Sequence, residues 1–142
     1  MSAGNRSAAL LSDVLSRLKE ASAVTDHLPD GAENIHPRPQ KGAREESVSL
    51  NVGFAGGSGE RRGPSTRSTR LVIVQLEADP EYFEGQPTRW PYEVLDAVEA
   101  TLEGVGGGGR APDGRGAGLA PAYDPEKDRY VADTTFRYVT SN

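Results

Sequence analysis

The stretch TRLVIVQLEA at residues 69–78 decides the fold. Val72, Val74 and Leu76 alternate with their neighbours, as in a strand whose successive side chains point to opposite faces of a sheet. The alternate positions, whose side chains point to the opposite face, begin with Leu71 and Ile73, so both faces of the strand are apolar at its start. A strand of this kind needs cover from both sides there, by helices or by a partner. We therefore expect residues 69–78 to form the strongest strand of the chain.

Two further strands are predicted, one on each side of it in the sequence. Residues 47–54 place Val48, Leu50 and Val52 at every second position, with small or polar residues between them, which indicates a half-buried strand. Residues 129–140 are rich in Tyr, Thr, Val and Phe, the residue types that suit a pleated surface.

Two amphipathic helices are predicted from apolar residues that recur at helical spacing. The first covers residues 7–21, with Ser7 as its N-cap and an apolar stripe of Leu10, Leu11, Val14, Leu15 and Leu18. The second covers residues 91–103, with Pro91 in its first turn and an apolar stripe of Val94, Leu95, Val98 and Leu102. Its opposite face is acidic and carries Glu93, Asp96, Glu99 and Glu103.

Long loops are expected at residues 25–45, 55–68 and 104–124, where Gly and Pro gather. Within the first of these loops, the sequence allows a short strand at Ile35. The predicted fold class is α+β, in a single domain over residues 1–142. It comprises a small antiparallel sheet of three or four strands with both helices packed on one face.

Composition excludes several classes of protein. The chain has no cysteine, which removes disulfide scaffolds, zinc ribbons and thiol nucleophiles. Its longest bulky apolar run, residues 71–74, is far shorter than the roughly 20 residues of a membrane span, and residues 1–20 lack the apolar core of a signal peptide. We expect a protein made in the cytoplasm, without a membrane partner.

Charge is distributed in blocks along the chain. Residues 38–70 hold seven basic and three acidic residues, whereas residues 71–105 hold one basic and eight acidic residues. The basic block includes Arg61, Arg62, Arg67 and Arg70 on the expected hairpin. These arginines suit a subunit-contact arm, a solvated loop or a phosphate contact. Opposite patches on one molecule favour head-to-tail association, so we expect these arginines to meet Glu93, Asp96, Glu99 and Glu103 of a neighbouring copy.

No motif in the chain predicts catalysis. Residues 104–109 match G-x-G-x-x-G in letters, but they follow a helix where a dinucleotide site follows a strand. His27 and His36 are nine residues apart across Pro29 and Gly31, which is not the spacing of a helical metal site. We therefore predict that the protein is not an enzyme and holds neither a cofactor nor a metal ion.

The order of the elements and the closing stretch RYVADTTFRYV (residues 129–139) resemble the tail terminator, or tail completion, proteins of long-tailed viruses of bacteria or archaea. The resemblance covers most of the chain and consists of pattern and spacing. It follows the helix 8–21, the strand 48–54, the glycine-and-arginine hairpin, the strand 71–78, the helix 91–103 and the strand 130–139.

The resemblance implies a virion protein of the tail or neck, assembled in the host cytoplasm. Such proteins form a ring, usually a hexamer, that caps the tail tube and joins it to the head. The implied partners are further copies of the chain, the tail-tube protein and the head connector or stopper protein, with DNA only as passing cargo. The alternatives are another neck component, such as a head-closure or connector protein, and a small non-viral ligand-binding or regulatory domain.

Overall fold

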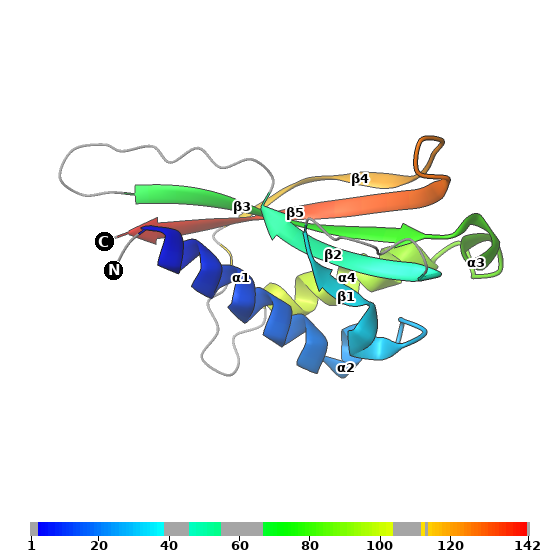
Figure 1. The fold of residues 1–142 in the computed structure, drawn as a ribbon, viewed down its shortest axis with the longest axis horizontal. Helices are drawn as coiled ribbons and strands as arrows, with labels where there is room; N and C mark the ends of the chain where they lie inside the picture. Colours follow the sequence, from blue (N-terminus) through cyan, green and yellow to red (C-terminus); the bar gives the residue numbers. More distant parts are fainter. Residues whose placement is uncertain (1–2, 39–45, 55–66, 104–111, 113, 142) are drawn as a thin grey trace.

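The computed structural model describes residues 3–38, 46–54, 67–103, 112 and 114–141. It contains one five-stranded sheet of strand order β1-β2-β3-β5-β4, with the helices on one face (Figure 1). The elements in chain order are α1 (Ala3–Glu20), α2 (Ser22–Thr25), η1 (Gly31–Asn34), β1 (Ile35–Pro37), β2 (Val48–Phe54), β3 (Arg67–Ala78), α3 (Pro80–Glu84), α4 (Trp90–Glu103), β4 (Gly114–Asp124) and β5 (Arg129–Ser141).

The strand β3 is the centre of the sheet. It pairs antiparallel with β5 along its whole length, from Arg67 opposite Ser141 to Ala78 opposite Tyr130. On its other side it pairs antiparallel with all seven residues of β2. Both pairings are antiparallel and join even-numbered residues to even-numbered residues. The even-numbered residues of the three strands therefore share one face of the sheet, and the odd-numbered residues share the other.

The hydrophobic core lies between the sheet and the helices α1 and α4. The sheet contributes its buried series Val48, Leu50, Val52, Val72, Val74, Leu76, Ala132 and Phe136. The helices contribute Leu10, Val14 and Leu18 from α1 and Val94, Leu95, Val98 and Leu102 from α4. Each fully buried Leu or Val stabilises the fold by about 1.5–3 kcal/mol. The α+β class with both helices on one face is thus confirmed.

We call the face of the sheet that packs against α1 and α4 the covered face, and the opposite face the open face. Among the described residues, no helix lies over the open face (Figure 1). Leu71 and Ile73 of β3 are half-buried there, so the cover that their pattern predicts does not come from the described helices.

The number of strands and their directions correct the sequence prediction. The sheet has five strands where three or four were expected, and β1 pairs parallel to β2, so the sheet is mixed. The short strand proposed at Ile35 is β1. The helix η1 directly precedes it within the expected 25–45 loop, and α2 ends where that loop was expected to begin. The strand β3 begins at Arg67, inside the expected 55–68 loop, because its polar first residues continue the ladder with β5.

The largest correction is β4, which occupies residues that we expected to form a loop at 104–124. Its sequence GRGAGLAPAYD lacks apolar alternation, and the strand forms because β5 offers it a paired edge. Two register irregularities, on either side of Leu119, accompany it. Pro121 is compatible with this position because β4 is an edge strand, where a missing N–H costs no ladder bond. The helix α1 also begins earlier than predicted, so Ser7 lies within it and is not its N-cap.

Candidate assembly surfaces

Three of the four acidic residues predicted as a subunit contact, Asp96, Glu99 and Glu103, lie on one stripe of α4. Its apolar stripe is buried against the sheet and α1, and Asp96 and Glu103 are exposed on the opposite side. Glu99 is half-buried, and Tyr92, with 51% of its surface exposed, belongs to the same helical stripe. We call Asp96, Glu99 and Glu103 the α4 acidic stripe.

Glu93 lies apart from that stripe, in a surface hollow at the start of α4. Its carboxylate is 2.7 Å from Nε of Arg89 and 4.0 Å from Nδ1 of His27. The hollow has a volume of about 310 Å³, and Tyr82 and Trp90 form part of its wall. Glu93 therefore already has a cationic partner, Arg89, within its own chain.

The predicted basic arm is only partly described by the structure. Arg61 and Arg62 lie outside the described residues. Arg67 is the first residue of β3, and Arg70 is half-buried further along it, opposite Tyr138 of β5.

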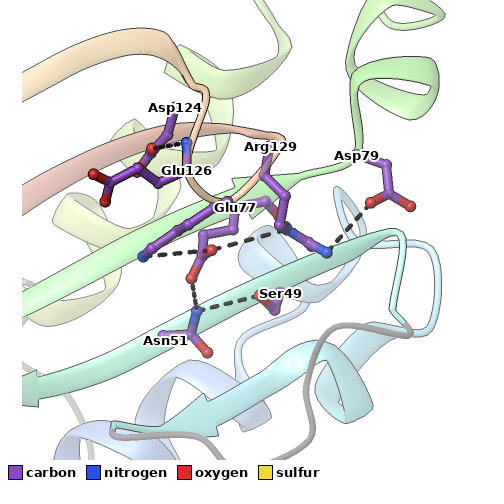
Figure 2. A network of polar contacts seen from close by, with 8 residues as sticks. Ser49, Asn51, Glu77, Asp79, Asp124, Glu126 and Arg129 are labelled. Atoms are coloured by element: carbon purple, nitrogen blue, oxygen red, sulfur yellow. Dashed lines mark hydrogen bonds and ion pairs between the residues drawn. The ribbon is translucent and has the colours of Figure 1, made fainter.

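A network of polar side chains occupies one end of the open face (Figure 2). Asn51 Nδ2 donates hydrogen bonds to Glu77 Oε2 at 2.8 Å and to Ser49 Oγ at 3.2 Å. Arg129, which is only 5% exposed, lies 3.8 Å from Glu77 Oε1 and donates to Asp79 Oδ1 at 3.3 Å. Asp79 immediately precedes α3, so the network ties the starts of β5 and α3 to β2 and β3.

Five of the nine aromatic residues form a continuous row, which we call the aromatic ladder. Phe83 stacks on Tyr130 with ring centroids 4.0 Å apart, and its edge contacts Trp90 at 6.4 Å. Tyr123 meets Tyr130 at 5.5 Å and Tyr82 meets Trp90 at 5.4 Å, both edge-to-face. The ladder runs from the β4–β5 turn across α3 to the start of α4. It carries offset-stacked and edge-to-face pairs, each worth about 0.5–1.5 kcal/mol beyond burial.

Sequence reasoning missed the aromatic ladder. Only the tertiary fold places Phe83 against Tyr130 and Tyr82 against Trp90. Burial raises the pKa of the Tyr82 phenol, and the nearby carboxylate of Asp30 adds to that shift. A hydrogen bond to Asp128 is the main cause that raises the pKa of Tyr123.

The two histidines are far from forming one site. His27 lies beside Glu93, whereas His36 of β1 is 2.7 Å from Glu46 Oε2. In the part of the chain that the structure describes, no group of three or more His, Asp or Glu residues is arranged to hold a metal ion. The G-x-G-x-x-G match at 104–109 lies outside that part. No helix among the described residues is long and apolar enough to cross a membrane.

Comparison with known proteins gives a likeness of fold. No protein-family model matches the sequence, and no curated protein matches it. Among solved structures, the chain is similar to a chain in the virion of a native gene transfer agent particle, with a TM-score of 0.59 and 13% identity. The match covers 94% of this chain and 95% of that chain. The two chains therefore share one fold from end to end.

Proposed function

We propose that the chain is a structural virion protein that forms a ring at the head-proximal end of a viral tail. The ring ends the growth of the tail tube and joins the tail to the head connector. The observation that carries the proposal is the mutual coverage of the fold match. A chain of a virion particle aligns over 95% of its length with 94% of this chain, so the likeness is not confined to one part of either chain. The order of elements quoted from the sequence supports the same role.

The ring closes through opposite charges on neighbouring copies. The arginine segment of one copy, with Arg61, Arg62, Arg67 and Arg70, contacts the α4 face of the next, with Glu93, Asp96, Glu99 and Glu103. The exposure of Asp96 and Glu103 on the side of α4 that faces away from the core supports this assignment. Such a contact uses two different patches, so it is heterologous and closes into a ring when the rotation between copies allows it. Acidic residues that line the channel would repel phosphate, which lets DNA pass without binding.

The test reverses charge in the arginine segment and then restores complementarity. We expect the Arg61→Glu/Arg62→Glu variant to lose the ring and remain a folded monomer, because its contact with the neighbour becomes repulsive. Sedimentation velocity measures the mass, and circular dichroism verifies the fold. The matched control is Lys19→Glu/Arg38→Glu, which changes net charge equally at exposed positions outside the arginine segment and keeps the ring.

A compensating variant makes this test specific. Adding Glu99→Arg/Glu103→Arg to the arginine reversal restores attraction with the signs exchanged, and we expect part of the ring population to return. If the Arg61→Glu/Arg62→Glu variant forms normal rings, the proposed contact is wrong.

The hollow beside Glu93 favours a second candidate, a small ligand-binding or regulatory domain. Its volume and its convergent polar groups, His27, Arg89 and Glu93, are features of small-molecule sites. The two candidates differ in oligomeric state. A chain that stays monomeric at every concentration, also when mixed with a tail-tube protein, supports this second function.

A further inference from the structure

The end of the molecule formed by α3 and the β4–β5 turn combines exposed aromatic and acidic side chains. Tyr123 is 46% exposed although its ring belongs to the aromatic ladder. Glu81 and Glu84 of α3 are exposed, and so are Glu126 and Asp128 of the turn. The contacts of Phe83 with Tyr130 and of Asp79 with Arg129 make α3 and the turn one continuous surface. We call it the acidic-aromatic end.

Tyr123 is held in place although it is exposed. Its hydroxyl donates a short hydrogen bond to Asp128, and its ring meets the edge of Tyr130. Asp128 has a φ of 52°, a left-handed conformation that is uncommon outside glycine, and Asp124 Oδ1 accepts a 3.0 Å hydrogen bond from the Glu126 amide. A tyrosine fixed before binding loses little conformational entropy on binding, which is why rigid tyrosines are effective interface anchors.

The charge of this surface defines the partner. Glu81, Glu84, Glu126 and Asp128 carry four negative charges at exposed positions, and the exposed cation among them is Lys127, which lies 3.7 Å from Glu77. An arginine can pair with these carboxylates and stack on the face of a tyrosine at the same time. Arg67 is the first residue of β3, and α3 follows the other end of that strand (Figure 1). A strand of this length spans roughly 36 Å.

We propose that the acidic-aromatic end is a docking surface for an arginine-bearing segment of a different protein. The choice of a different protein rests on the proposed function, because in the proposed ring the arginines of every copy are engaged by the α4 face of its neighbour. In the proposed ring, the acidic-aromatic end of each copy then binds the protein that stacks above or below the ring. Tyr123 anchors the partner, and the carboxylates of α3 and of the β4–β5 turn surround the anchor.

The test measures binding of a fluorescein-labelled peptide of alternating arginine and glycine to the full-length protein by fluorescence anisotropy. We expect Tyr123→Ala to weaken binding about two- to fivefold, the range expected for a cation–π contact at an exposed site. Tyr123→Phe keeps the aromatic face, so its affinity stays within about twofold of the wild type. The matched control is Tyr92→Ala, which removes an equally exposed tyrosine outside the aromatic ladder and leaves binding unchanged.

A second pair of variants separates position from net charge. Glu81→Gln/Glu126→Gln removes two carboxylates at the acidic-aromatic end and weakens binding, whereas Glu20→Gln/Glu33→Gln removes two exposed carboxylates from α1 and η1, outside both proposed surfaces, and does not. The proposal is overturned if both carboxylate pairs weaken peptide binding equally, or if Tyr123→Ala and Tyr92→Ala weaken it equally. It is also overturned if the wild type does not bind the peptide.

The oligomeric mass of the same variants distinguishes this proposal from the proposed function. If Tyr123→Ala breaks the ring, the acidic-aromatic end binds a second copy and the proposal of a different partner is wrong. If the wild type is a monomer that binds the peptide through Tyr123, the ring is wrong while the docking surface stands.

Discussion

The covered and open faces of the same sheet are built from different chemistry. On the covered face Val72, Val74 and Leu76 are buried beneath α1 and α4. On the open face the neighbouring positions are half-buried, and the residues that are buried there, such as Asn51 and Arg129, are polar and both contact Glu77. A face that water reaches is thus stabilised by polar contacts between side chains, whereas a face with its own helices relies on apolar burial. The comparison also indicates that the open face, which no described helix covers, is the face of the sheet that other molecules can reach.

The largest expected effect comes from the same substitution on the two faces. Val74→Ser buries a hydroxyl and removes packing beneath the helices, so we expect the free energy of unfolding to fall by about 3 kcal/mol. Ile73→Ser, one position earlier on the open face, is expected to cost about 1 kcal/mol because Ile73 is only half-buried. Urea denaturation of both variants measures the difference. Equal losses would mean that the open face is buried as deeply as the covered one.

The next effect concerns the polar network of the open face. Arg129→Met leaves Asp79 without its partner, while Glu77 keeps Asn51 and Lys127, so we expect a loss of about 2 kcal/mol, below the usual range for breaking a buried pair. Arg137→Met, on the same strand and face but exposed, is the control and is expected to change stability by less than about 0.5 kcal/mol. Indistinguishable melting curves for the two variants would show that the network does not stabilise the fold.

A smaller effect is expected at Gly53, where β2 passes close to Arg38. A Cβ atom added to Gly53 would lie 2.7 Å from Cβ of Arg38, so the backbone after β1 must shift. We expect Gly53→Ala to cost about 1 kcal/mol. Gly85→Ala is the control, because its added Cβ would lie 3.4 Å from the carbonyl oxygen of Glu81, at the edge of ordinary contact. Thermal denaturation of the two variants provides the comparison, and an equal or larger loss in Gly85→Ala contradicts it.

The smallest effect lies at the rim of the covered face, where the aromatic ladder reaches solvent. The hydrogen bond to Asp128 raises the pKa of Tyr123, so the protonated phenol is favoured in the folded state. This contribution is present below the ordinary tyrosine pKa and is lost as pH rises through the raised pKa, so stability falls at alkaline pH. Asp128→Asn is expected to lower the pKa of Tyr123 and leave that of Tyr82 unchanged, as measured by NMR titration of the ring signals. An unchanged Tyr123 pKa would show that the hydrogen bond does not hold the ring.

The elements that the sequence predicts are those whose side chains face the core. The stripe of α4 and the alternation of β2 and β3 reflect burial on one face, and burial leaves a period in the sequence. The strand β4 leaves none, since its glycine-rich sequence follows the edge of β5 and does not form a core face of its own. Asp96, Glu99 and Glu103 of α4 could be placed on one surface from helical spacing, whereas Glu93 lies apart from them in the hollow at the start of the helix. The aromatic ladder and the contact of Asn51 with Glu77 could not be foreseen, because they join residues distant in sequence through the tertiary fold.

The solution mass of the wild-type protein tests the central claim most directly. The account predicts a discrete ring, observed by native mass spectrometry as one species at a fixed multiple of the 15.1 kDa chain. It also predicts that this species dissociates as salt concentration rises, because exposed opposite charges hold it together. A protein that remains a monomer at every concentration, at low salt and in the presence of a tail-tube protein, would contradict the account.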